Sequence, residues 1–412
     1  QEPELMKEKH TRLLIRDAIY STIFVYLCIL VFSLNPLNLK VFNLIGSSMK
    51  DIEFTDIMFS GKNQGHGEIE TKISNDIIVV NAADRGRAEI ARLIDKINQE
   101  QPAVIGVDFI FEGPKDEFSD SMLAASFNKC KNLVLATKFK NNDGERHNDY
   151  IKTASTLGEH TEGFANLMIP SMDKTVRYFR TEDQGNKTLT RPFAFEVVKK
   201  YNPSQAEKLI KRNNQFELIN YEGNLNNVHH FNGNDIEAGQ FPKDFLKGKI
   251  VLLGFFGSDC NSNPILDDYF YTPMNEKIMG RKFPDTYGVV IQANIVNMIL
   301  TEDYIEKTPA WFDWLIGFVI CLLHNFIFIR HYVHKHLWYH FYAKIIQFLS
   351  AFVLVYLCIY LFKENHIKLH VSPLILPVLL TVDLLYFYDT LLKWMHKKFG
   401  TNTYFLTGPA HH

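Results

Sequence analysis

Residues 75–111 read NDIIVVNAADRGRAEIARLIDKINQEQPAVIGVDFIF. Two β-branched runs, residues 75–84 and 103–111, flank a segment of different periodicity at residues 87–101. The apolar side chains of that segment recur at helical spacing: Ile90, Leu93, Ile94 and Ile97. Strand, helix and strand in this order are typical of a parallel sheet with right-handed crossovers. The stretch therefore predicts the first part of an α/β domain.

The same pattern continues along the chain. Residues 120–130 predict a second helix, residues 132–139 a third strand, and residues 247–257 a late strand. Between them, TVRYFRTE (175–182) predicts an edge or antiparallel strand, and RPFAFEVVKKY (191–201) predicts a helix. We therefore expect an α/β domain with a mainly parallel mixed sheet.

Four apolar runs lie outside this domain, at residues 17–34, 309–329, 343–362 and 371–392. A bilayer core about 30 Å thick requires about 20 apolar residues of helix, so each run predicts a transmembrane helix. The first run follows a basic leader, residues 1–16, and no small-residue cleavage site comes after it. We interpret this run as an uncleaved signal anchor.

The basic residues set the expected orientation of these spans. The leader, the 330–342 loop and the tail at residues 393–412 are rich in Lys, Arg and His. Loops that carry an excess of Lys and Arg face the cytoplasm, so both termini are expected there. Residues 35–308 would then form a domain outside the cytoplasm.

Several short motifs occur in a defined order. They are IIVVNAAD-x-GR, PAVIGVDFIF, a D-x-x-L-A helix from Asp120 to Ala124, GKIVLLG, D-x-x-x-TP from Asp268 to Pro273, and YGVVIQANIVNMIL, which predicts a helix at residues 288–300 leading back to the membrane. With one span before the domain and three after it, this set resembles the CHASE family of extracellular sensory domains, type two, over residues 40–395. The stretch GFFGSDCNSNP departs from the small residues that the resemblance leads us to expect.

The resemblance implies a multi-pass sensory protein of the bacterial inner membrane, with its large domain in the periplasm. Family members are usually followed by a cytoplasmic histidine kinase, nucleotide cyclase or serine/threonine kinase. The sequence has no such output domain, so we expect its signal to pass to membrane or periplasmic partner proteins, with a homodimer as a further possibility.

Four carboxylates are candidate ligand-binding residues: Asp84, Asp108, Asp267 and Asp268. Each follows a predicted strand, and ligands of open α/β folds bind at the carboxyl ends of the strands. A Ca²⁺ or Mg²⁺ ion would suit such oxygens. The alternative is structural, with Asp84 capping the next helix and Asp108 bonding backbone in a turn.

Three of the ionisable side chains within the predicted spans are candidates for functional contacts: His324, Asp383 and Asp389. Asp383 is near the expected midplane, whereas His324 and Asp389 are at similar expected depth and could pair. Such groups usually face a bundle interior or a partner because their insertion into the bilayer costs a few kcal/mol. They predict either a contact with another subunit or an internal hydrogen bond that fixes helix register.

Other chemistry is not indicated. The net charge of −2 argues against a nucleic-acid partner. The sequence lacks G-x-S-x-G, P-loop, H-E-x-x-H and kinase signatures, so we expect neither an enzyme nor a bound cofactor. Adjacent His229 and His230 predict a solvated loop. Cys130 and Cys260 are the two cysteines outside the apolar runs, and we expect them to be unpaired, with a disulfide as the alternative.

Two functions fit these features. The first is a non-enzymatic membrane receptor whose outer domain recognises a ligand or a protein. The second is a structural subunit of a cell-envelope complex without a small-molecule ligand. A receptor should have a pocket with a few convergent polar groups, whereas a scaffold should expose an apolar patch with a polar rim.

Overall fold

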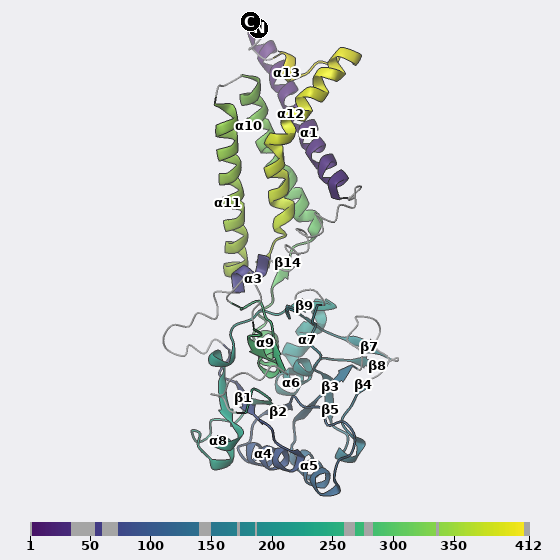
Figure 1. The fold of residues 1–412 in the computed structure, drawn as a ribbon, viewed down its shortest axis with the longest axis vertical. Helices are drawn as coiled ribbons and strands as arrows, with labels where there is room; N and C mark the ends of the chain where they lie inside the picture. The colour runs from purple at the N-terminus through teal and green to yellow at the C-terminus, as the bar shows by residue number, and fades with distance from the viewer. Residues whose placement is uncertain are drawn as a thin grey trace. The chain divides into compact units, whose positions relative to one another are not determined.

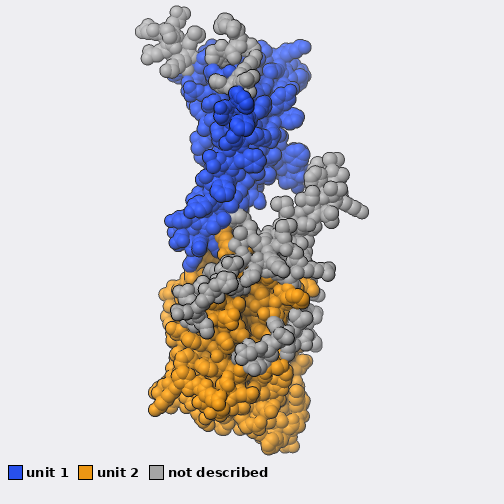
Figure 2. Space-filling model, turned by 60° about the vertical axis from the view of Figure 1, so that its left-hand side comes forward, with its two compact units in different colours: residues 1–48, 306–412 blue, residues 49–305 orange. Residues whose placement is uncertain are grey.

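The computed structural model describes residues 2–33, 54–59, 73–139, 150–170, 174–185, 188–258, 268–275, 283–334 and 338–407. The chain divides into two compact units, which Figure 2 colours separately. Unit 1 comprises residues 1–48 and 306–412, and unit 2 comprises residues 49–305. Unit 2 lies within the range predicted for the outer domain, residues 35–308, and unit 1 contains the ranges predicted for the four spans.

Unit 2 is built around a seven-stranded sheet with the order β10-β1-β11-β2-β3-β4, in which β5 also pairs with β3. The strands are β1 (Ile77–Asn81), β2 (Val104–Val107), β3 (Leu133–Phe139), β4 (Tyr150–Ile151), β5 (Thr161–Phe164), β10 (His229–Asn232) and β11 (Ile250–Gly254). Every pair is parallel except β3 with β4. The predicted mainly parallel mixed sheet is therefore confirmed.

Strand β11 lies between β1 and β2, although it follows them by well over a hundred residues. Leu253 of β11 pairs with Val80 on one side and with Val107 on the other. All residues of these three strands are buried, as expected when helices cover both faces of a parallel sheet.

Helices cover both faces of the sheet (Figure 1). Helices α4 (Arg87–Gln99) and α5 (Glu117–Lys129) pack on one face. Helices α6 (Phe193–Tyr201) and α9 (Gly288–Thr301) pack on the other, and α7 (Pro203–Arg212) packs against both α6 and α9. The helices predicted at residues 87–101, 120–130, 191–201 and 288–300 are all present.

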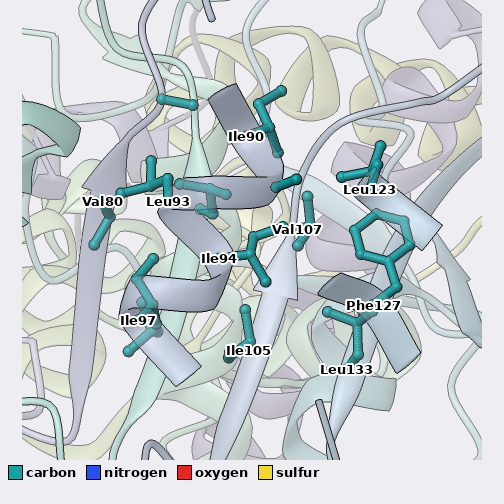
Figure 3. Close-up of a cluster of buried hydrophobic side chains, with 14 of the residues drawn as sticks. Val80, Ile90, Leu93, Ile94, Ile97, Ile105, Val107, Leu123, Phe127 and Leu133 are labelled. Carbon is teal, nitrogen blue, oxygen red and sulfur yellow. The ribbon is translucent and has the colours of Figure 1, made fainter. Parts of the chain in front are cut away.

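Side chains of α4 and α5 fill the space above β1, β2 and β3 (Figure 3). Alternate strand residues such as Val80 and Val107 point to this side because side chains alternate across a strand. Leu93, Ile94 and Phe127 meet them and are fully buried. Each such side chain contributes roughly 1.5–3 kcal/mol through burial.

The rest of unit 2 consists of short elements. Antiparallel pairs join β6 (Tyr178–Arg180) to β9 (Phe216–Leu218), β7 (Asp183–Gly185) to β8 (Thr188–Thr190), and β12 (Tyr269–Phe270) to β13 (Thr286–Tyr287). Helices α3 (Phe54–Phe59) and α8 (Gly233–Ala238) also belong to it. The antiparallel strand predicted within residues 175–182 is thus β6.

One local prediction was wrong. His229 and His230 do not lie in a solvated loop but begin β10, which pairs with β1. Both side chains are half-buried, and His229 Nε2 bonds Asn75 Oδ1 at 2.9 Å. Cys130 has a free thiol, and Cys260 lies outside the described residues.

The described part of unit 1 contains four helices that are long and apolar enough to cross a membrane. They are α1 (Glu2–Ser33), α10 (Ala310–Val333), α11 (Tyr339–Asn365) and α12 (Val371–Phe399). The predicted one-plus-three arrangement is confirmed, but the helices extend beyond the apolar runs because helical hydrogen bonding continues into polar flanking residues. The leader, for instance, is continuous with the first span.

The two ends of the helical bundle in unit 1 are tied by different contacts. At one end, Asp17 Oδ2 accepts hydrogen bonds from Thr403 Oγ1 and Tyr404 N, both at 2.7 Å, at the start of α13 (Tyr404–Thr407). At the other end, β14 (Glu306–Lys307) pairs with β15 (Ile367–Lys368). There the buried carboxylate of Asp313 lies 2.6 Å from His370 Nδ1.

Candidate functional site

A cavity of about 550 Å³ opens where the strands of unit 2 end. Asp84 comes shortly after β1, Phe255 directly after β11, and Asp108 directly after β2. Lys138 near the end of β3 and Asn166 just after β5 complete this row. The cavity therefore follows the carboxyl edge of the sheet.

The cavity lies at a topological switch point. Strands β1 and β2 lead to α4 and α5 on one face, whereas the helix that follows β11 in the chain, α9, covers the opposite face. Because the connections diverge at β11, they leave a crevice beyond the strand ends. Ligands of open α/β sheets bind in such crevices.

Three of the four predicted ligand-binding residues line this cavity: Asp84, Asp108 and Asp268. Asp267 lies outside the described residues. The alternative role for Asp84 was wrong, because Gly86 occupies the N-cap of α4 and its N–H donates to Glu89 Oε2 at 2.9 Å.

Asp108 is attached to the sheet by its backbone. Its N–H donates to the carbonyl of Leu253 at 2.8 Å. Within the described part of the chain, its carboxyl group makes no hydrogen bond and no ion pair, so the alternative of a backbone-bonded turn aspartate is not found.

The environment of the cavity favours the neutral forms of two acids. Burial raises the pKa of Asp108 to about 7, and the negative charge of Asp268 adds to this effect. Burial also raises the pKa of Asp268 to about 7. Both carboxyl groups can therefore gain or lose a proton near neutral pH.

Helix α9 supplies two lining residues that the sequence did not single out. Gly288 is its first residue, and a Cβ there would lie 3.0 Å from Asp268 Oδ1. Gln292, one turn further, is only 4% exposed, and its Nε2 donates to the carbonyl of Ala165 at 3.2 Å. The available signal was a polar Gln within the apolar stretch YGVVIQANIVNMIL.

The described residues contain no group of three or more His, Cys, Asp or Glu side chains arranged to hold a metal ion. The carboxylates of Asp84, Asp108 and Asp268 thus line one cavity without converging on one point. The hypothesis of a Ca²⁺ or Mg²⁺ site gains no geometric support from them.

The ionisable residues of the spans have partners within unit 1. Asp383 accepts from Lys344 Nζ through both carboxylate oxygens, each at 2.8 Å. His324 Nε2 bonds Ser350 Oγ at 2.9 Å. Asp389 accepts from Tyr332 OH at 3.0 Å and from Lys393 Nζ at 2.7 Å.

The pairing of His324 with Asp389 was therefore wrong. Tyr332 is the residue of α10 level with Asp389, and it lies two turns beyond His324, a distance of about 12 Å along the helix axis. The depth expected for His324 was counted from the predicted end of the apolar run, whereas α10 continues past that end to Val333.

Together these features define a multi-pass membrane protein that carries an α/β domain with a cavity at the carboxyl edge of its sheet. The family model for the CHASE2 domain matches residues 71–327, and the chain belongs to that family. CHASE2 is a family of extracellular-type sensory domains rather than of catalytic ones. No curated protein and no solved structure matches the chain.

Proposed function

We propose that this protein is a non-enzymatic receptor of the bacterial inner membrane. Its CHASE2 domain binds a small molecule in the cavity at the carboxyl edge of the sheet, and its state passes to partner membrane proteins. The observation that carries this proposal is the meeting of Asp84, Asp108 and Asp268, from separate segments, in one cavity.

The form of the cavity supports a receptor. Ligand sites typically enclose about 300–1,000 Å³ and combine apolar walls with a few polar groups. Here three half-buried aromatic residues, Phe109, Phe255 and Phe270, stand beside the carboxylates. The competing role, a structural subunit, predicts an exposed apolar patch. In the described part of unit 2 the exposed large apolar side chains come from separate segments: Phe118, Ile169, Leu189, Ile210 and Phe283.

Charge distribution supports the proposed orientation. The basic leader, the basic end of α10 and the basic tail belong to one end of the bundle, where Asp17 binds Thr403 and Tyr332 packs against Phe405. Positive flanks are retained in the cytoplasm, so this end is proposed to be cytoplasmic and the CHASE2 domain periplasmic.

Helix α9 is the proposed route from the cavity to the membrane. Its first turns bear Gly288 and Gln292, and residues 302–309 join its last residue to α10. In unit 1, pairing of β14 with β15 and the contact of Asp313 with His370 tie the start of α10 to the start of α12. A shift of α9 on ligand binding would therefore be transmitted to α10 and α12 at the same time.

The experiment is to purify the full-length protein from native membranes in mild detergent and to identify the proteins that accompany it. Wild type is compared with Asp108→Asn/Asp268→Asn, and Asp244→Asn serves as a control because Asp244 is an exposed carboxylate outside the cavity. A receptor should show partners whose recovery changes in the double variant and not in the control. Identical stoichiometric recovery with all three chains would favour the structural subunit instead.

A further inference from the structure

We propose that the cavity binds an organic amine, whose ammonium group faces Asp108 and Asp268 and whose apolar part packs against Phe109, Phe255 and Phe270. This inference rests on the proposed function, because it takes the cavity to be the ligand site. It adds the chemical class of the ligand.

The first argument is the excess of hydrogen-bond acceptors. Among the described residues, the side chains of Asp84, Asp108 and Asp268 have no hydrogen-bond donor and no cation paired with them. Asp84 is exposed, whereas Asp108 and Asp268 are half-buried. Ionised carboxylates are acceptors only, and one that is partly withdrawn from water gains from a donor or a positive charge. A ligand that carries N–H donors would supply these hydrogen-bond partners.

Gln292 provides a second, independent argument. Its side chain is 4% exposed and lines the cavity. Because its Nε2 faces the carbonyl of Ala165, the amide orientation is fixed, and Oε1 is the atom available to accept from a ligand. An amide oxygen in the same cavity as the carboxylates can accept from a further donor on the ligand.

The net charge of the cavity and its aromatic lining residues also favour a cationic ligand with an apolar part. Lys138 is the one cationic side chain among the described lining residues, and it is exposed at the rim. The cavity has three carboxyl groups and this single cationic side chain. It therefore attracts cations once the carboxyl groups are ionised. Aromatic faces add attraction for an ammonium group and bury apolar carbon.

A bare metal ion fits this cavity less well than an organic cation. The described carboxylates do not form a group of three metal ligands, and about 550 Å³ is far more space than one ion needs. The aromatic residues would also have no role toward an ion that retains its water. An amine with an apolar chain or ring can contact both the carboxylates and the aromatic residues of the cavity.

Proton linkage gives this proposal a distinctive signature. In the empty cavity the pKa values of Asp108 and Asp268 are raised to about 7, so an ammonium ligand must displace protons near and below that pH. Alkyl amines have pKa values of about 10 and remain charged throughout this range. Affinity should therefore rise with pH up to about 7 and then level off.

The test uses the full-length protein in detergent and two matched series of probes. One is 2-phenylethylamine, 2-phenylethanol and phenylacetate, and the other is hexylamine, hexanol and hexanoate. Binding is measured by calorimetry and thermal shift at about pH 6 and about pH 8. We expect at least one amine to bind roughly tenfold more tightly than its alcohol and its acid, because a charge-assisted hydrogen bond is worth about 1.5–3 kcal/mol. We expect the affinity of that amine to be roughly tenfold higher at the upper pH.

The Asp108→Asn/Asp268→Asn variant separates the cavity from nonspecific uptake of amines by detergent. It should lose roughly tenfold or more of the amine affinity and most of the pH dependence, whereas Asp244→Asn should keep both. Thermal unfolding of the double variant without ligand checks that it is folded.

Three results would overturn the inference. Binding of an alcohol or an acid as tight as that of its amine would leave the receptor proposal standing with a different ligand class. A response to CaCl₂ or MgCl₂ that both Asn substitutions abolish would establish a metal site instead. A lack of binding by every probe would refute the amine, and the small molecules carried by the native protein would then decide whether the cavity is a ligand site.

Discussion

The carboxyl groups of Asp108 and Asp268 line the same cavity, although one directly follows β2 and the other directly precedes β12. The charge of Asp268 contributes to raising the pKa of Asp108. Burial and the negative charge of Asp268 both disfavour the ionisation of Asp108, and folding alone does not benefit from this arrangement. We infer that their role is in binding.

Replacing these acids should therefore stabilise the domain. Because the folded-state pKa of each is raised to about 7, ionisation destabilises the fold as the pH rises from about 4 to about 7, and the loss persists above that range. Asp108→Asn should raise the free energy of unfolding at about pH 8 by up to about 4 kcal/mol, with little effect near pH 4. Thermal unfolding at both pH values measures this, and a lower melting temperature for the variant at pH 8 would contradict it.

Gly288→Ala should weaken ligand binding without unfolding the domain. The new Cβ would lie 3.0 Å from Asp268 Oδ1 and 3.3 Å from Phe270, so both side chains must shift. We expect a loss of roughly tenfold in affinity for the ligand, which corresponds to about 1.4 kcal/mol. Gly86→Ala is the matched control, since its Cβ would meet Glu89 at an ordinary 3.7 Å. Equal affinities of the two variants would count against the site.

The buried pair of Arg87 and Asp120 should be essential for stability. Arg87 Nη1 lies 2.5 Å from Asp120 Oδ1, and Arg87 also donates to the carbonyl of Gly113 at 2.7 Å. The hydrogen bond from Arg87 is the main cause that lowers the pKa of Asp120, so this stabilisation is present at neutral pH and is lost as the pH falls through the folded-state pKa.

Asp120→Asn should lower the melting temperature of the domain markedly, because it leaves the Arg87 charge buried without a counter-charge. Asp95→Asn is the control, since its partner Lys129 is largely exposed and such pairs contribute little. Similar melting temperatures for the two variants would show that the buried pair has no special role.

The ion pair of Lys344 and Asp383 should hold α11 against α12. Either Lys344→Met or Asp383→Asn should weaken this packing by about 1 kcal/mol, as interhelical polar contacts in membranes do. The exchange Lys344→Asp/Asp383→Lys should restore helix packing, measured by unfolding in detergent. Recovery of partner proteins is measured for the same variants. If the exchange restores helix packing but not the recovery of a partner, Asp383 contacts another subunit instead.

Much of the fold was predictable from local patterns. Residues 75–111 revealed β1, α4 and β2 because buried β-branched runs and an amphipathic helix have different periodicities. The insertion of β11 between β1 and β2 was not predictable, because strand order depends on long-range packing. His229 and His230 were misassigned for the same reason: pairing with β1 places polar residues in an edge strand.

The candidate site was predictable in part. The rule that ligands bind beyond the carboxyl ends of strands identified Asp84, Asp108 and Asp268. Gln292 and Gly288 were missed because they come from a helix, and only the fold brings α9 to the strand ends. In unit 1, Lys344 was missed as the partner of Asp383 because the register between α11 and α12 is not encoded in either helix alone.

The most direct measurement is a comparison of the small molecules released when purified full-length protein is denatured. Wild type, Asp108→Asn/Asp268→Asn and Asp244→Asn are extracted from native membranes in the same way and analysed by mass spectrometry. The account predicts a compound, or a small set of compounds, that is present with wild type and Asp244→Asn and depleted with the double variant. Identical released compounds from all three proteins would contradict the claim that this cavity is the ligand site.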